Sequence, residues 1–318
     1  MRRILILSLS ICLYLSCSKS NSSSSTPPPS TEVDTLNSWV KVSNAGFELD
    51  DIWFTDIKTG FVAGSTSIFA STDSGNTWTV VPNTGSFKVF NIQFLDNLHG
   101  FAQGTTQLVF TTDGGKTWSL KPIASGYAYT FQFLTPSTGY LNDYVKGIYK
   151  TSDTGTTWKL VYDGTGKGPN FFFDFLDTST GFANVNAHFN KTTDAGNNWQ
   201  VLASNITDTS FKSFYKMQFL DTLNGFFSSP NGLFRTSDGG KSWTNTLPRQ
   251  TTFMVPHFFD KNNGYCLAAN TIYKTTNGGN NWTVSCKLGQ DDFSGMHFLD
   301  MNTGWATTFG GFVLRLKP

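Results

Sequence analysis

The stretch Ser71-Thr72-Asp73-Ser74-Gly75-Asn76-Thr77-Trp78 decides the fold, because near copies of it recur along the chain. The other copies, which we call boxes together with the first, end at tryptophans about forty residues apart: Trp118, Trp158, Trp199, Trp243 and Trp282. A period of about forty residues, with several short strands in each unit, is typical of propellers and related arrays. The sequence therefore predicts a repeat architecture.

A second motif precedes each box. It consists of a Phe, which we call the strand-one Phe, and a Gly-aromatic pair a few residues later. Its seven copies are Phe54 with Gly60-Phe61, Phe94 with Gly100-Phe101, Phe133 with Gly139-Tyr140, Phe175 with Gly181-Phe182, Phe219 with Gly225-Phe226, Phe258 with Gly264-Tyr265, and Phe298 with Gly304-Trp305. Alternating apolar residues bounded by Gly, Asp and Asn indicate four short strands in each unit, the fourth beginning at the box Trp. The fold class is therefore all β.

The two ends of the chain explain why seven strand-one motifs accompany only six boxes. The last unit stops after a third strand at Val313-Leu314-Arg315, while Trp39-Val40 near the N-terminus matches a fourth strand. We expect the N-terminal strand to complete the last blade, because such closure removes the exposed edges of an open array. The prediction is a seven-bladed β-propeller of four-stranded antiparallel blades over residues 37–318.

The N-terminal residues resemble an export signal. Residues 1–17 contain a basic start, a short apolar run and Cys17, as in a bacterial lipoprotein signal peptide whose cysteine becomes acylated. Residues 18–36 are rich in Ser and Pro and are typical of a flexible tether. We expect an exported protein, lipid-anchored in the outer or inner membrane of a bacterial cell envelope and facing the periplasm or exterior. Ordinary cleavage is the alternative, and it also predicts export.

Charge and cysteine content exclude some functions. The formal net charge of the 318 residues is +1, whereas nucleic-acid binding rests on a clustered surplus of Lys and Arg, so the charge argues against a nucleic-acid partner.

Cys266 and Cys286 fall on the second and fourth strands of one sheet, roughly 9 to 10 Å apart, which is too far for a disulfide. We expect two buried free thiols.

The box itself is predicted to be structural. Its acidic residue can accept hydrogen bonds from the turn that follows, and its Gly supplies a positive φ. A catalytic carboxylate repeated around a ring would be hard to explain, so we expect no catalysis there. The residues concerned are Asp73, Asp113, Asp153, Asp194, Asp238 and Asn277.

The box pattern resembles the Asp-box, or bacterial neuraminidase repeat, and the seven units look most like the photosystem II stability/assembly factor family. That resemblance implies a non-enzymatic propeller that binds newly made membrane protein. Sialidases share the box but need three arginines that converge on the substrate carboxylate. The mature domain has only Arg235, Arg249 and Arg315, and two of these occupy the same repeat position on third strands, where they would not converge on a pocket. A glycoside hydrolase with paired carboxylates, or a glycan-binding propeller, remains the alternative.

Irregular inter-blade links share one face of a propeller, here called the link face, while the repeated turns share the other, the motif face. Loops on a rigid scaffold commonly carry binding. Two groups of candidate residues lie on the links. The acidic group, which could bind a cation or supply a catalytic pair but is more simply a solvated loop, is Glu48, Asp50, Asp51, Asp291 and Asp292. The group suited to a protein or glycan surface, or alternatively to burial on the blade tops, includes Tyr127, Tyr129, Lys212, Tyr215 and Arg249.

Two further columns recur at fixed positions. The residues before the strand-one Phe are expected to form a ring of inter-blade hydrogen bonds and not a metal site: Trp53, Gln93, Gln132, Asp174, Gln218, His257 and His297. The third strands end in a cationic column that could bind anions but is expected to pair locally: Lys150, Lys191, Arg235, Lys274 and Arg315. No cofactor motif is present. The prediction is a monomeric binding or assembly module with an envelope or membrane protein as partner, and no enzyme.

Overall fold

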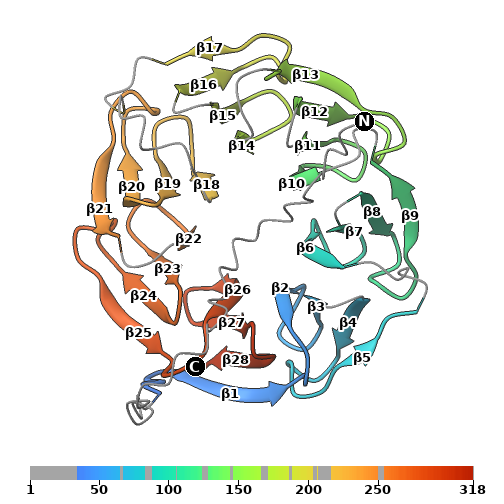
Figure 1. The fold of residues 1–318 in the computed structure, drawn as a ribbon, viewed down its shortest axis with the longest axis vertical. Coiled ribbons are helices and arrows are strands. Elements are labelled where there is room, and N and C mark those ends of the chain that lie inside the picture. Colours follow the sequence, from blue (N-terminus) through green and yellow to red (C-terminus); the bar gives the residue numbers. More distant parts are fainter. Residues whose placement is uncertain are drawn as a thin grey trace, which may run out of the picture. The chain divides into compact units, whose positions relative to one another are not determined.

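The described part of the chain consists of short β-strands that form seven four-stranded antiparallel sheets in a ring (Figure 1). The structure is a computed structural model. It describes residues 34–64, 67–82, 88–104, 106–123, 128–143, 146–165, 171–185, 188–202, 206, 216–249 and 254–317. The predicted all-β, seven-bladed propeller is confirmed.

Six of the blades follow the order of the chain, with the innermost strand first. Blade 1 contains β2 (Leu49–Phe54), β3 (Gly60–Gly64), β4 (Ser67–Ser71) and β5 (Thr79–Val80). Blade 2 contains β6 (Val89–Phe94), β7 (Gly100–Gly104), β8 (Gln107–Thr111) and β9 (Ser119–Pro122). Blade 3 contains β10 (Ala128–Phe133), β11 (Gly139–Asp143), β12 (Gly147–Thr151) and β13 (Lys159–Asp163).

Blades 4 to 6 repeat this order. Blade 4 contains β14 (Phe171–Phe175), β15 (Gly181–Val185), β16 (His188–Thr192) and β17 (Gln200–Val201). Blade 5 contains β18 (Lys216–Phe219), β19 (Gly225–Ser229), β20 (Gly232–Thr236) and β21 (Thr244–Pro248). Blade 6 contains β22 (Met254–Phe258), β23 (Gly264–Ala268), β24 (Thr271–Thr275) and β25 (Thr283–Lys287). Each of these fourth strands begins one residue after the box Trp.

Blade 7 joins the two ends of the chain. Its strands are β26 (Phe293–Asp300), β27 (Thr303–Thr308), β28 (Phe312–Leu316) and β1 (Trp39–Asn44). β1 pairs antiparallel with β28, so that Trp39 lies opposite Leu316 and Val40 opposite Arg315. Figure 1 shows β1, in blue, outside the red strands of this blade. The predicted closure by the N-terminal strand is confirmed.

The glycine that opens each second strand lies on the ring of the strand-one Phe of its own blade. A Cβ atom added to Gly60 would lie 2.4 Å from the ring of Phe54, closer than real Cβ contacts. The same contact with the blade's own Phe recurs at Gly100, Gly139, Gly181, Gly225, Gly264 and Gly304. The Phe and the Gly are therefore two halves of one packing unit, which explains why they recur together.

Each strand-one Phe also stacks on the aromatic residue of the Gly-aromatic pair in the preceding blade. The ring centroids are 3.6 Å apart for Phe54 and Trp305, and 3.5 Å for Phe175 and Tyr140. The other pairs are Phe94 with Phe61, Phe133 with Phe101, Phe219 with Phe182, Phe258 with Phe226, and Phe298 with Tyr265. Stacking of this kind adds to the burial of aromatic area. These aromatic side chains are buried and join every blade to the next.

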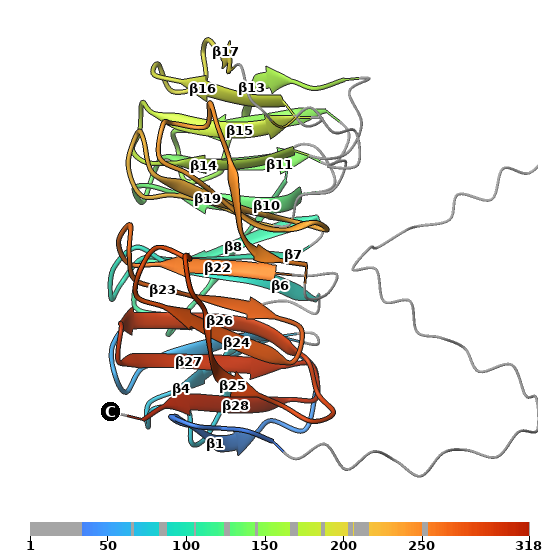
Figure 2. The ribbon, with the colours of Figure 1, turned by 90° about the vertical axis from the view of Figure 1, so that its left-hand side faces the viewer.

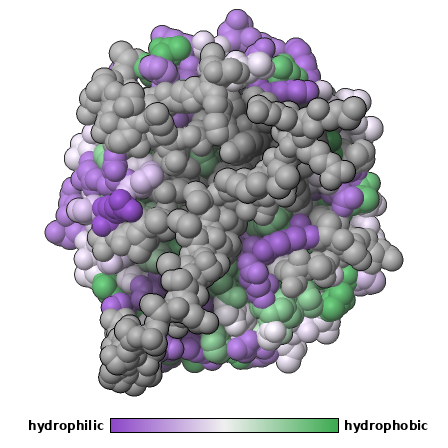
Figure 3. Space-filling view, in the orientation of Figure 1, coloured by the Kyte–Doolittle hydropathy of each residue, from purple (hydrophilic) through white to green (hydrophobic). Residues whose placement is uncertain are grey.

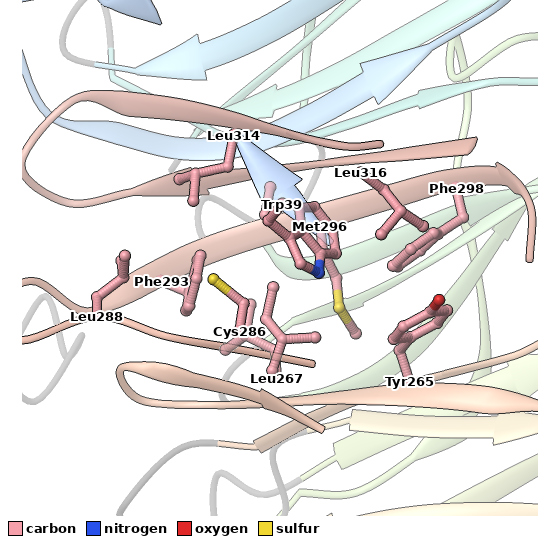
Figure 4. Packing of buried hydrophobic residues seen from close by; sticks show 12 residues of the cluster. Trp39, Tyr265, Leu267, Cys286, Leu288, Phe293, Met296, Phe298, Leu314 and Leu316 are labelled. Carbon is pink, nitrogen blue, oxygen red and sulfur yellow. The ribbon is translucent and has the colours of Figure 1, made fainter. Parts of the chain in front are cut away.

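Trp39 packs the closure between blades 6 and 7. It is fully buried and shares a cluster with Tyr265, Met296 and Leu316 (Figure 4). Its indole N–H donates to the Ser285 hydroxyl of blade 6 at 2.9 Å. The closing strand is therefore attached to two blades.

The cysteines behave as predicted. Cys266 on β23 and Cys286 on β25 are free and buried. Burial raises the pKa of Cys286 to about 12, so this thiol is not a nucleophile near neutral pH.

The predicted signal and Cys17 lie outside the described residues, so the domain boundaries stay predictions. At the end of the proposed tether, however, Asp34, Thr35 and Leu36 are bound to the propeller. In the described ranges the chain has no helix long and apolar enough to cross a membrane.

Candidate functional site

The boxes are turns held by their own hydrogen bonds. In the first box, Asp73 accepts the Thr77 N–H at 2.9 Å and the Thr77 hydroxyl at 2.7 Å. The Ser71 hydroxyl donates to Asp73 at 2.8 Å and accepts the Gly75 N–H at 2.9 Å. Gly75 has a φ of 88°, as predicted. The N–H four residues on bonds in the same way to Asp113, Asp153, Asp194, Asp238 and Asn277.

These bonds keep the box carboxylates ionised. The hydroxyl and the N–H of Thr77 together lower the pKa of Asp73 to about 2. Thr117 and Thr157 lower the pKa of Asp113 and of Asp153 to about 2 in the same way. A carboxylate with so low a pKa has no proton to donate near neutral pH. The box carboxylate therefore stabilises its own turn, which we call a structural staple, and it is not a proton donor near neutral pH.

Each box is also tied to the turn between the first two strands of its blade. The Ser74 N–H donates to the Lys58 carbonyl at 3.0 Å, and the Gly114 N–H to the Leu98 carbonyl at 3.0 Å. The corresponding donors in the later blades are Thr154, Ala195, Gly239 and Gly278. These turns form the motif face, which lies with the C-terminal end on the left of Figure 2.

In the column before the strand-one Phe, five of the seven side chains form the predicted hydrogen bonds to the next blade: Gln93, Gln132, Asp174, Gln218 and His297. Gln93 of blade 2 accepts the Phe133 N–H at 2.8 Å and donates to the Phe133 carbonyl at 2.9 Å. Gln132 makes the same pair of bonds with Phe175, and Gln218 with Phe258. Each Gln thus satisfies the backbone of the next blade's first strand.

The three ionisable members of the column depart from this pattern. Asp174 accepts the Phe219 N–H at 2.5 Å, and burial raises its pKa to about 6. His297 accepts the Phe54 N–H at 3.2 Å, and burial lowers its pKa to about 3. His257 lies beside Phe298, with its pKa lowered to about 4 by burial. Among the described residues no group of three His, Cys, Asp or Glu side chains could hold a metal ion.

Four of the five members of the cationic column pair locally. The ammonium groups of Lys150, Lys191 and Lys274 lie over the rings of Tyr140, Phe182 and Tyr265 on the neighbouring strand, at 5.8, 5.4 and 5.4 Å from the centroids. Arg235 donates to the Gly278 carbonyl in the next box at 3.2 Å. Cation–π contact and carbonyl pairing account for these charges, so the structure favours the local interpretation over an anion-binding arc.

On the link face, the acidic group divides into separate parts. Asp50 and Asp51 belong to β2 and not to a link, contrary to the expected boundary. Lys88 of blade 2 binds both Glu48, at 3.0 Å, and Asp50, at 3.3 Å. Burial raises the pKa of Asp50 to about 7 although Lys88 opposes the shift, and its Oδ2 atom has no hydrogen-bond partner.

The remaining acidic residues have other partners. Asp51 accepts the Ile52 N–H of its own blade at 2.9 Å and the Ile92 N–H of blade 2 at 3.0 Å. The second of these is a further inter-blade hydrogen bond. Asp291 accepts the Gly310 N–H at 3.0 Å. Burial, and then the charge of Asp291, raises the pKa of Asp292. Within the described residues, the acidic group therefore contributes to one charged cluster, which consists of Glu48, Asp50 and Lys88.

The second group of candidates is placed only in part. Tyr127, Lys212 and Tyr215 lie outside the described residues, Tyr129 belongs to β10, and Arg249 is exposed directly after β21. On the face in Figure 3, hydrophilic and hydrophobic residues of the described chain are interspersed. Sequence reasoning missed Lys88, because its acidic partners lie about forty residues earlier in the chain. The three residues come together only because blades 1 and 2 are adjacent in the ring.

The comparisons with known proteins agree with this geometry. The family model of the photosynthesis system II assembly factor YCF48 matches residues 31–171. YCF48 from Cyanidioschyzon merolae superposes with a TM-score of 0.68 at 17% identity, over 88% of this chain and 99% of that one. A structure of YCF48 bound to D1 peptide has a TM-score of 0.68 at 19% identity, over 89% of this chain and 97% of that one.

Enzymes share the fold as well. The GH74 xyloglucanase from Xanthomonas campestris has a TM-score of 0.66 at 11% identity, over 86% of this chain but only 52% of the enzyme. No curated protein matches the sequence. The resemblance to the photosystem II assembly factors, expected from the boxes, is confirmed, and the likeness to the xyloglucanase is one of fold.

Proposed function

We propose that this chain, an Asp-box propeller that resembles the photosystem II assembly factors of the YCF48 type, is a non-catalytic binding or assembly module for a membrane protein of the cell envelope. The observation that carries the proposal is the family match over residues 31–171 on a complete seven-bladed ring. A YCF48 structure is known with a D1 peptide bound, which supports a protein segment as the kind of partner. The repeated carboxylates are engaged in turns, which removes the most regular candidates for catalysis.

The proposal includes export and a lipid anchor at Cys17. The basic start, apolar run and cysteine of residues 1–17 support it. Replacing Cys17 with Ala is expected to move the protein from the membrane fraction to the soluble fraction without changing its fold. Equal membrane recovery of both forms would contradict the anchor.

Capture of partners from the native envelope tests the function. The full chain, tagged at its C-terminus, is crosslinked in intact cells and isolated, and membrane proteins should be enriched over a tagged unrelated lipoprotein. The variants Lys88→Gln and Arg249→Ala probe the link face, and Lys58→Gln on the motif face is the matched control. Loss of a specific membrane protein with the link-face variants alone supports the proposal, whereas enrichment no greater than for the unrelated lipoprotein contradicts it.

A second candidate is a carbohydrate-active enzyme. The observation in its favour is Asp50, whose pKa of about 7 suits a general acid and which shares Lys88 with Glu48. Hydrolysis of a panel of β-glucans and xyloglucan, abolished by Asp50→Asn and by Glu48→Gln, would support this function. An absence of turnover with the full chain, confirmed to be folded, would reject it.

A further inference from the structure

The short segment before β1 crosses from blade 6 to blade 7. Thr35 forms an antiparallel bridge with Lys287 at the end of β25: the Thr35 N–H donates to the Lys287 carbonyl at 2.7 Å, and the Lys287 N–H donates back at 2.8 Å. Asn37 adds a side-chain bond to the Val284 carbonyl at 3.0 Å. In Figure 1 the start of β1 lies beside the end of β25. We call residues 34–38 the strap.

The strap is tied to both blades. Asp34 accepts the Gly289 N–H of blade 6 at 3.0 Å and forms an ion pair of 2.6 Å with Lys41 on β1 of blade 7. Leu36 packs against the hydrophobic cluster that contains Trp39. The Ser38 carbonyl accepts the Lys317 N–H at 2.6 Å. Backbone, charge and apolar contacts therefore all meet at the seam between the two blades.

This contact matters because β1 is the outermost strand of blade 7. It comes from the other end of the chain, so no covalent connection within the blade holds it there and only non-covalent contacts do. A pull on the chain directly at Trp39 would break the bonds between β1 and β28 one after another, beginning at Trp39 and Leu316. With the strap in place, the pull acts first on the Thr35–Lys287 bridge, which belongs to blade 6. The four strands of blade 6 are continuous in the chain, so this blade is not opened at a seam.

We propose that the strap is a lock on the ring closure, which keeps β1 in blade 7 when a pulling force acts on the chain before residue 34. The proposal does not depend on the identity of the partner or on catalysis. It assigns a conformational role to residues 34–36, which the sequence alone places in a tether, and to residues 37 and 38, which it places at the start of the propeller.

The experiment compares Thr35→Pro with Thr35→Val in the full chain. Proline removes the N–H that donates to Lys287 and valine retains it, so the two variants differ in the bridge. Hydrogen–deuterium exchange is measured for the peptides that cover β1, β25 and, as an internal reference, β12 of blade 3. We expect exchange in β1 to be about tenfold faster in Thr35→Pro and unchanged in Thr35→Val, with β12 the same in all proteins.

A second variant, Asp34→Ala with Asn37→Ala, retains the backbone bridge and removes the side-chain bonds at its ends; it decides the matter if the proline variant does not fold. Unfolding under force, pulled between the two termini, should begin at a lower force in whichever variant accelerates β1 exchange. Faster exchange confined to β25, or no change in β1 in either variant, would overturn the proposal, since the strap would then merely cover the edge of blade 6.

Discussion

At the scale of single residues, the ring is held by side chains that bond to the backbone of the next blade. Glutamine suits this position because its amide both accepts from the N–H and donates to the carbonyl of the next strand-one Phe, as Gln93 does. Asp174 occupies the same position with an ionisable acceptor, which can accept from Phe219 but donates only when protonated. Blades 4 and 5 are therefore joined by a bond that depends on pH.

Replacing Asp174 with Gln should stabilise the protein. Burial raises the pKa of Asp174 from 3.8 to about 6, so its contribution to stability is complete below pH 3.8 and is lost as the pH rises through 6. Relative to wild type, the free energy of unfolding of Asp174→Gln should gain about 1 to 3 kcal/mol at pH 7.5 and much less at pH 4.5. Urea unfolding at the two pH values measures the difference.

The reciprocal variant Gln93→Asp is the control, since it places the carboxylate between blades 2 and 3. It should lose stability at pH 7.5 and recover part of it at pH 4.5. Equal effects of either substitution at the two pH values would show that the carboxylate is ionised throughout.

At the scale of the element, each blade repeats a turn that satisfies itself. The box needs an oxygen acceptor and not a charge, because Asn277 accepts the Asn281 N–H at 2.9 Å just as Asp238 accepts the Ser242 N–H at 2.9 Å. This equivalence distinguishes a structural staple from a chemical site.

The variant Asp238→Ala should lower the melting temperature by about 2 to 4 °C, because the Ser242 N–H and hydroxyl lose their acceptor. Asp238→Asn retains one acceptor oxygen and should melt close to wild type. Differential scanning calorimetry compares the three proteins. If the Asn variant melts as low as the Ala variant, the charge itself is required and the staple interpretation is wrong.

The glycine of the Gly-aromatic pair offers a second test at this scale. Gly139→Ala would place a Cβ 2.7 Å from the Phe133 ring, which is itself stacked on Phe101 at 3.6 Å, so it should cost about 2 to 3 kcal/mol of unfolding free energy. Gly46 has a φ of 78° with no atom within 4 Å of such a Cβ, so Gly46→Ala should cost about 1 kcal/mol from backbone strain alone. Equal losses in chemical denaturation would argue against the packing explanation.

At the scale of the whole molecule, stability depends on the seam in blade 7. Every other blade is continuous, whereas this one is assembled from the two ends of the chain. Trp39 fills the seam from the N-terminal side, and the Ser285 bond extends it to blade 6.

Trp39→Ala should therefore cost about 3 to 5 kcal/mol of unfolding free energy, because it leaves a large cavity at the closure. Trp78→Ala, at the equivalent strand of blade 1 but only partly buried, is the matched control and should cost less. Guanidinium unfolding followed by circular dichroism measures both. A Trp39 variant no less stable than the Trp78 variant would mean that the seam is not a weak point of the ring.

The sequence by itself determined the architecture, because the repeat states each packing unit several times. The seven pairs of a strand-one Phe with a Gly-aromatic pair, the missing seventh box and Trp39 together predict the closure, and the antiparallel pairing of β1 with β28 confirms it. The buried free cysteines and the inter-blade bonds of Gln93, Gln132 and Gln218 could also be predicted from the sequence, since both follow from strand register.

Only the tertiary structure decided which neighbours the irregular residues meet. Contacts between different blades produce the ion pairs of Lys88 with Glu48 and Asp50 and the hydrogen bond from Ile92 to Asp51. They also hold residues 34–36 against blade 6. Such residues occur once, at no repeated position, so no pattern along the chain signals their partners. The repeat specifies what all blades share, and the contacts that distinguish one blade from another come from the closed ring.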